Sequence, residues 1–166
     1  MSSLTILGID PGIKNTGYGV VKVADNNEPQ LRTFGHFHTN AKLSLAKRLH
    51  QIYSGLEHII ADVRPDIMAV ENIFYSENVK TAIIMGHARG AILIAGMNSK
   101  CEIAEYSPRE VKQSVVGNGG AAKEQVRFMV KQLLRTKQDI QPDDASDALA
   151  VALCHWHKLT FNRLVE

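Results

Sequence analysis

The sequence predicts an α/β fold with a mixed five-stranded sheet, three antiparallel strands followed by two parallel ones, flanked by helices. Two observations support this fold class. The chain up to about residue 39 holds three apolar or alternating runs separated by turn residues, a pattern typical of an antiparallel meander. After it, short apolar runs alternate with longer stretches of helical periodicity, which is typical of strands joined by helices.

The three opening strands are predicted over residues 4–9, 18–23 and 31–39. The first is apolar and β-branched enough to be buried, and Asp10-Pro11-Gly12 ends it. Aspartate, asparagine and proline over residues 25–29 predict the turn that follows the second strand.

A helix, a strand and a second helix follow this meander. Apolar residues at spacings of four and three predict a helix over residues 45–63. The apolar run over residues 67–70 predicts a short strand that ends at Glu71, and a helix is predicted over residues 78–96.

Small residues form a stripe on that second helix, where Ala82, Gly86 and Gly90 recur every four residues. Glycine is costly inside a helix, so the stripe favours close packing against another element. A subunit interface is one possibility.

The last predicted elements are a strand and three helices. The strand covers residues 102–106, and Ser107 with Pro108 then supplies the cap and first position of a helix. Two further helices are predicted over residues 122–134 and 144–157. We therefore predict one domain over residues 1–158 and a C-terminal tail over residues 159–166.

Composition is that of an ordinary globular domain, with 166 residues, 45% apolar and 22% charged. No apolar run approaches the roughly 18 residues expected of a membrane span, and residues 1–4 do not resemble a signal peptide. A cytoplasmic location without a membrane partner is expected, and the two separated cysteines are expected to be reduced thiols.

Positive charge is concentrated in one segment, residues 108–137, with seven basic and two acidic side chains, although the whole chain carries only +2. Lys123, Arg127, Lys131 and Arg135 recur every four residues there and predict a positive ridge on one helix. Such a ridge suits phosphate contacts, although a solvated helix face explains its distal members equally well.

Four acidic residues stand out by position. Asp10 and Glu71 each end a predicted strand, where side chains of α/β sheets enter a ligand-binding crevice. Asp144 and Asp147 lie three apart and share one face near a helix start. Each alone suits a turn or a cap, but together they are sufficient ligands for a pair of divalent cations.

Other site chemistries find little support in the sequence. The histidine pairs lack a zinc-binding spacing, and neither a Gly-x-Ser-x-Gly elbow nor a P-loop is present. The glycine-rich residues 117–120 do not follow a strand, so they predict a flexible loop and not a phosphate cradle.

Several motifs then occur in order along the chain: Leu7-Gly8-Ile9-Asp10-Pro11-Gly12 with Thr16-Gly17-Tyr18-Gly19, Glu71-Asn72-Ile73-Phe74, Gly86-His87-Ala88-Arg89-Gly90, Tyr106-Ser107-Pro108-Arg109-Glu110-Val111-Lys112, Val115-Val116-Gly117-Asn118-Gly119, and Asp144-Ala145-Ser146-Asp147-Ala148-Leu149-Ala150. The ordered set resembles the RuvC family of bacterial Holliday junction resolvases, within the retroviral-integrase/RNase H superfamily. The resemblance covers nearly the whole chain, from about residue 4 to residue 157.

The resemblance implies an RNase H-like fold and a magnesium-dependent endonuclease that nicks four-way DNA junctions symmetrically in recombination and repair. Asp10, Glu71, Asp144 and Asp147 would be the catalytic set and would hold two Mg²⁺ ions per site, with Mn²⁺ as a substitute. The family also implies a homodimer and a RuvA–RuvB branch-migration complex as partners.

The same resemblance implies the DNA contacts. Phe74 matches an aromatic residue used against junction bases, whereas the residues alone leave core packing and base stacking equally open. Lys112 and Lys123 match basic DNA-contacting positions, and Arg109 lies in the stretch similar to the family's DNA-binding segment.

One departure is the adjacent pair Asp143-Asp144, in which either residue could be the ligand. The spacing to Asp147 favours Asp144, with Asp143 as the helix cap. Three rival functions also remain: an ATP-binding protein of the actin/sugar-kinase class, an inactive junction binder, and another RNase H-like nuclease. The shortness of the chain argues against the first, and the four carboxylates argue against the second.

Overall fold

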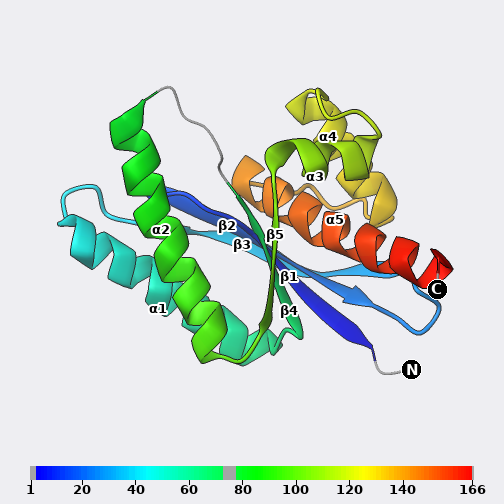
Figure 1. Ribbon diagram of the computed structural model, residues 1–166, viewed down its shortest axis with the longest axis horizontal. Coiled ribbons are helices and arrows are strands. Elements are labelled where there is room, and N and C mark those ends of the chain that lie inside the picture. The colour runs from blue at the N-terminus through cyan, green and yellow to red at the C-terminus, as the bar shows by residue number, and fades with distance from the viewer. Residues whose placement is uncertain (1–2, 73–77, 166) are drawn as a thin grey trace.

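The computed structural model describes residues 3–72 and 78–165, which form a five-stranded sheet and five helices within those ranges (Figure 1). The elements in chain order are β1 (Leu4–Asp10), β2 (Asn15–Val23), β3 (Pro29–His38), α1 (Leu45–Val63), β4 (Ile67–Glu71), α2 (Val79–Asn98), β5 (Glu102–Tyr106), α3 (Pro108–Val116), α4 (Lys123–Leu133) and α5 (Asp143–Val165).

The sheet confirms the predicted fold class. Its strand order is β3-β2-β1-β4-β5. β1 pairs antiparallel with β2, and β2 pairs antiparallel with β3. β4 pairs parallel with both β1 and β5. The carboxyl ends of β1, β4 and β5 therefore meet at one edge of the sheet.

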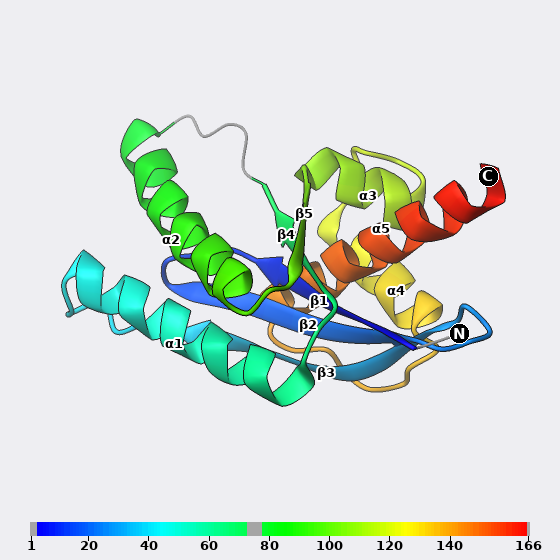
Figure 2. The ribbon, with the colours of Figure 1, turned by 60° about the horizontal axis from the view of Figure 1, so that its bottom comes forward.

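Helices cover both faces of the sheet, as the two views show (Figures 1 and 2). α1 and α2 pack on one face around Leu7, Ile9 and Val70, whereas α3, α4 and α5 pack on the other around Ile6 and Ala69. The alternation follows from the two-residue period of a strand, so Asp10 and Glu71 fall on the α5 side.

Helix α5 lies unusually close to the sheet because glycines line its path. A Cβ built on Gly17 would lie 2.0 Å from the Asp144 carbonyl oxygen, and one built on Gly8 would lie 2.0 Å from the Ala148 carbonyl oxygen. Any larger residue would push the helix away from the strands. These glycines set the position of the Asp144 end of α5 over the sheet.

Local signals explain the helix starts. The Ser44 hydroxyl accepts a hydrogen bond from Lys47 N at the start of α1. Ser107 and Glu110 form the predicted capping box of α3, with Pro108 at its first turn. Two predicted ends were wrong: β2 begins at Asn15 and α5 continues to Val165, through residues expected to be a tail.

The extension of α5 is tied to the β2–β3 turn. Trp156 Nε1 donates to the Asn27 carbonyl oxygen at 3.1 Å, and Asn27 Nδ2 donates to Thr160 Oγ1 at 3.1 Å. These contacts join residues far apart in the sequence, which is why periodicity alone ended the helix too early.

Helix α2 corrects the expectation about membrane spans. Its 20 residues are long and apolar enough to cross a membrane by length and composition, although one such helix is weak evidence. Ala88, Ile92 and Ala95 are fully buried, and Arg89 forms an ion pair with Glu105 of β5. The helix is therefore an integral part of this domain.

The predicted glycine stripe on α2 makes no close contact within the described chain. A Cβ built on Gly86 or Gly90 would meet nothing within 4 Å. Ile83 and Ile94 are 57% and 58% exposed on the same helix. The expected close packing is thus not satisfied within one copy of the chain.

Candidate active site

Two adjacent parallel strands supply the first two carboxylates of the site. Ile9 of β1 pairs with Val70 of β4, so Asp10 and Glu71 follow one step later at the same edge and on the same face. β-branched and apolar residues bury both strands up to this point. Their ends therefore deliver two side chains to one crevice.

Helix α5 supplies the other two. Asp144 and Asp147 lie three residues apart near its start, one turn along the same face. The contact between Gly17 and the Asp144 backbone places this turn beside the β1–β2 hairpin, where Asp10 pairs with Gly17. The close approach of α5 thus joins the two halves of the site.

All four carboxylates line one pocket of about 300 Å³. Lys112 of α3 and Lys123 of α4 line it as well, and Lys123 Nζ lies 3.7 Å from Asp147 Oδ2. The remaining walls come from apolar or backbone-restricted residues, namely Pro108, Val111, Val126 and Ala150. The pocket therefore combines four carboxylates with two lysines.

Burial and neighbouring charges raise the pKa values of three of these carboxylates, those of Asp10, Glu71 and Asp147. Burial raises the pKa of Asp10 well above its ordinary value, and the charges of Glu71, Asp147 and Asp144 raise it further. Burial and the Asp147 charge raise the pKa of Glu71 to about 7, against a lowering by Lys112 and Lys123. Burial also raises the pKa of Asp147, which Lys123 partly offsets.

This donor set fits a hard divalent cation. Carboxylate oxygens are the ligands that Mg²⁺ prefers, and a bound cation would favour the ionised forms of Asp10, Glu71 and Asp147, whose pKa values burial and neighbouring acids raise. Within residues 3–72 and 78–165, no three Asp, Glu, His or Cys side chains are already arranged to hold an ion by themselves. Mg²⁺ usually keeps several water ligands and takes phosphate oxygens from a substrate, so it does not require a complete cage of protein ligands.

Asp143 does not share this pocket. The prediction that it caps α5 is wrong: Asp143 is the first residue of the helix, and its carboxylate pairs with Arg127 of α4. The pocket lining contains Asp144 and Asp147 instead. Of the two adjacent acids, Asp144 therefore lines the pocket and Asp143 does not.

The predicted basic ridge is only partly present. Arg127 is occupied by Asp143, and Arg135 lies beyond the end of α4 and pairs with Glu28. Lys123 faces the carboxylates at the start of α4. Lys123, the first residue of the ridge, therefore lies at the pocket, whereas Arg127 and Arg135 are paired elsewhere.

Arg109, a further predicted DNA contact, does not line the pocket. Arg109 is exposed on α3, and its side chain packs on the 117–120 loop, where a Cβ on Gly119 would lie 2.7 Å from Arg109 Cγ. Phe74 lies outside the described residues. Arg109 thus stands near the site without entering it.

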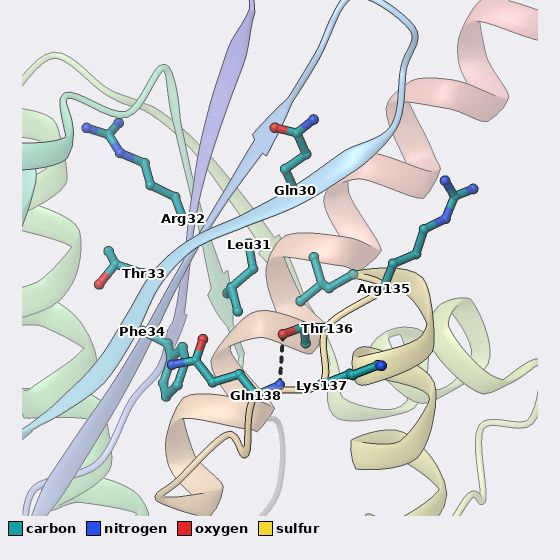
Figure 3. A pocket seen from close by; sticks show the side chains of 10 residues that line it. Gln30, Leu31, Arg32, Thr33, Phe34, Arg135, Thr136, Lys137 and Gln138 are labelled. Atoms are coloured by element: carbon teal, nitrogen blue, oxygen red, sulfur yellow. Dashed lines mark hydrogen bonds between the residues drawn. The ribbon is translucent and has the colours of Figure 1, made fainter.

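A larger hollow of about 690 Å³ lies elsewhere, between β3 and the segment after α4 (Figure 3). Its basic side chains turn away from it: Arg32 donates to the Val63 carbonyl oxygen, and Arg135 pairs with Glu28. Its lining contains no carboxylate or histidine. The larger hollow is therefore not the candidate active site. The smaller pocket is, because four carboxylates and two lysines line it.

A buried hydrogen bond between β5 and α5 was not predicted. Tyr106, at the end of β5, and His155 of α5 share a hydrogen bond of 2.6 Å between the hydroxyl and Nδ1. Burial raises the pKa of Tyr106 to about 12 and lowers that of His155. The bond holds α5 to the strand beside Glu71, but its partners are 49 residues apart and no local pattern connects them.

Comparison with known proteins matches this architecture. The family model described as "Crossover junction endodeoxyribonuclease RuvC" matches residues 6–155. The chain belongs to the RuvC family. A relative of that name from Desulforamulus reducens is 49% identical over 152 residues, covering 92% of this chain and 93% of the relative.

Solved structures of the family agree with the fold. The structure of Thermus thermophilus RuvC matches with a TM-score of 0.87 and 32% identity, covering 96% of this chain and 97% of that one. T. thermophilus RuvC in complex with a Holliday junction substrate matches with a TM-score of 0.89 and 33% identity, covering 96% of both chains. The RNase H-like fold expected from the motifs is confirmed.

Proposed function

We propose that this chain is a structure-selective endodeoxyribonuclease that resolves Holliday junctions in recombination and repair, by metal-dependent hydrolysis of phosphodiester bonds. The observation that supports it is the pocket in which Asp10, Glu71, Asp144 and Asp147 converge beside two lysines. In a RuvC-family chain, this is the arrangement that phosphodiester hydrolysis requires. The relatives' name and the junction complex of T. thermophilus RuvC support the same substrate.

The four carboxylates would hold two Mg²⁺ ions, or Mn²⁺ in their place. Bound there, the pair would supply an activated water and stabilise the leaving oxygen of the cleaved phosphodiester. Asp10 and Glu71 stand on rigid strand ends, and Asp144 and Asp147 stand on a helix that packs directly on those strands. The chain thereby holds both sides of the metal site on packed elements.

The lysines serve the substrate phosphate. Lys123 stands 3.7 Å from Asp147, close enough to neutralise the acid when metal is absent and to turn to a phosphate when metal replaces it. Lys112 lines the same pocket and lowers the pKa of Glu71. Arg109, nearby on the exposed side of α3, contacts the DNA backbone outside the pocket, and Phe74 stacks on junction bases.

The functional unit is a homodimer, which cuts two strands of the junction with two sites. The uncovered apolar face of α2 supports this assembly, since large exposed apolar patches mark interaction surfaces. A RuvA–RuvB complex as partner and a cytoplasmic location rest on the family resemblance alone.

Cleavage of labelled synthetic junctions tests the proposal. The wild-type protein should introduce paired nicks near the crossover of mobile four-way junctions of varied core sequence with Mg²⁺, and none with EDTA. Matched duplex and RNA–DNA hybrid substrates should remain intact. Tight junction binding without nicks would reduce the protein to a binding scaffold, and cleavage of the hybrid alone would place it among other RNase H-like nucleases.

A further inference from the structure

The loop of residues 11–16 connects the two halves of the carboxylate site. It comprises the turn after β1 and the first two residues of β2, Asn15 and Thr16, and it ends before Gly17, which pairs with Asp10 across the hairpin. Gly17 also touches the backbone of Asp144, where its Cβ would lie 2.0 Å from the carbonyl oxygen. The conformation of this 11–16 loop therefore affects where Asp10 stands relative to Asp144.

The loop is closed from within by a buried threonine. Thr16 is fully buried, and its hydroxyl donates to the Gly12 carbonyl oxygen at 2.8 Å. Gly12 folds tightly over the turn, since a Cβ there would lie 2.1 Å from the Asn15 carbonyl oxygen. The turn thus has little room to change shape by itself.

The loop is also held from outside, by Thr39 and Arg48. The Thr39 hydroxyl donates to the Ile13 carbonyl oxygen at 2.5 Å, and Thr39 N donates to the Lys14 carbonyl oxygen at 3.0 Å. Arg48 Nη2 donates to the same Ile13 oxygen at 3.2 Å, and Arg48 Nε donates to Thr39 Oγ1 at 3.0 Å. We call this arrangement the Arg48–Thr39 clamp.

The clamp is built on packed elements. Thr39, 1% exposed, follows β3, and Arg48 lies in the first turns of α1. Because β3 and β1 both run antiparallel to β2, Thr39 reaches the same edge of the sheet as Asp10. Its bonds from a charged donor are stronger than those between neutral groups.

The clamp opposes the repulsion between the Asp10 and Asp144 carboxylates. Asp10 and Asp144 line the same pocket, and like charges that share one pocket repel one another. Without a cation they repel, and an unrestrained surface loop would yield first. A fixed loop keeps the carboxylates at a separation that suits a metal before the metal arrives.

We propose that Arg48 and Thr39 are positioning residues for the metal site, which hold the 11–16 loop so that Asp10 stays beside Asp144. This inference rests on the proposed metal-binding role of those carboxylates. Groups that orient metal ligands commonly contribute about tenfold or more in metal affinity, and the clamp acts one step further out, through the backbone.

Metal binding by the protein without DNA tests the proposal. Arg48→Met keeps the aliphatic stem and removes both donated bonds. We expect it to weaken Mn²⁺ binding, followed by electron paramagnetic resonance, by about threefold to tenfold. The Mg²⁺ concentration for half-maximal junction cleavage should rise in parallel, while junction affinity in Ca²⁺ stays the same.

Arg32→Met is the matched control. Like Arg48, Arg32 donates a side-chain hydrogen bond to a backbone carbonyl oxygen of another element. Its acceptor is the Val63 carbonyl oxygen at the opposite end of α1, at 2.9 Å. It should leave Mn²⁺ affinity unchanged. Thr39→Val should reproduce the Arg48→Met effect, and the double variant should be no worse than either single one, because both act on the Ile13 carbonyl.

The outcomes separate this inference from the proposed function. Equal Mn²⁺ affinity for Arg48→Met and Arg32→Met, with both folded by thermal melting, would overturn the clamp while leaving the carboxylate site in place. If instead Asp10→Asn binds Mn²⁺ as tightly as wild type, the metal-binding set itself is wrong, and the clamp has no ligand to position.

Discussion

Two acidic residues of the site, Asp10 and Glu71, stand where the folded chain disfavours their ionised forms. Asp10 and Glu71 are acids with raised pKa values in a partly buried pocket, so ionising them costs free energy in the folded chain. Structural sites usually pair such groups, whereas here only Lys123 comes within 4 Å of one of the four carboxylates among the described side chains. Stored repulsion of this kind is typical of catalytic sites.

Asp10→Asn should abolish cleavage while leaving junction binding largely intact. The amide keeps the shape but loses the charge that would hold a cation. We expect the cleavage rate to fall by more than about 100-fold, beyond the loss typical for a group that only supports a ligand. Single-turnover cleavage and junction binding in Ca²⁺ measure the two effects. Cleavage at the wild-type rate would remove Asp10 from the metal site.

Stability should depend on pH and Mg²⁺ together. Glu71 has a pKa of about 7 in the folded chain against an ordinary value of 4.5. Its folded form binds the proton more tightly, so its contribution to stability is present below about pH 4.5 and lost as pH rises through 7. Mg²⁺ binds the ionised form and should therefore raise the melting temperature more at pH 8 than at pH 6.

Thermal melting across this pH range measures the coupling, with each kcal/mol worth about 2–4 °C in a chain of this size. Glu71→Gln is the control, since it cannot titrate and should flatten the decline of metal-free stability above pH 6. An identical Mg²⁺ effect at both pH values, in wild type and variant, would contradict the assignment.

Lys112→Ala should weaken junction binding and flatten its salt dependence. Lys112 lines the pocket of the four carboxylates, where the proposed function requires a substrate phosphate. Removing one phosphate-binding lysine should lower the slope of log affinity against log salt by about one. Lys47→Ala, an exposed lysine on α1, is the matched charge control. An unchanged slope for Lys112→Ala would count against a phosphate contact.

The sequence predicted that the four carboxylates would form one set, and all four line one pocket, although each alone also suits a turn or a cap. Asp10 and Glu71 end apolar strands, and Asp147 lies one turn beyond Asp144. The partners of Asp143 and His155 could not be predicted, because Arg127 and Tyr106 come from other elements and no periodicity relates them. Side-chain pairing across elements is decided by packing.

Among the elements, α5 contributes most to the site. It packs on β1 and β2 through a path of glycines, its first turn carries two carboxylates, and its later turns bind Tyr106 and the β2–β3 turn. The sequence predicted its start well but ended it near residue 157. A terminal helix held by tertiary contacts carries little amphipathic signal of its own.

Gly17→Ala should disturb the site through α5. Its Cβ would lie 2.0 Å from the Asp144 carbonyl oxygen, so the helix start must move. We expect a decrease of about 1–3 kcal/mol in the free energy of unfolding, as for other overpacked sites, together with weaker Mn²⁺ binding. Gly120→Ala is the control, since its Cβ would make only an ordinary contact at 3.5 Å. Equal denaturation midpoints for the two variants would contradict this account.

The molecule as a whole has two unequal sides. One face of the sheet carries α3, α4 and α5 with the active site at its edge, and the other carries α1 and α2 (Figure 2). The fold class followed from the sequence, since each strand and helix has its own local pattern, whereas the strand order β3-β2-β1-β4-β5 came from the structure. The outward face of α2 did not follow from the sequence either: the glycine stripe predicted close packing, and within one copy of the described chain nothing occupies it.

That face predicts the assembly state. Val79, Ile83, Ile94 and Met97 are 71%, 57%, 58% and 64% exposed along one helix, and a second copy of the chain would remove this apolar surface from water. Ile83→Glu should therefore convert the proposed dimer into monomers, measured by sedimentation velocity. Phe128→Glu on α4, where Phe128 is 61% exposed, introduces the same charge elsewhere and should leave the dimer intact. A monomeric Ile83→Glu chain should still nick junctions singly but lose paired cleavage. If Ile83→Glu sediments as a dimer, the interface lies on another face, and the α2 stripe has a different role.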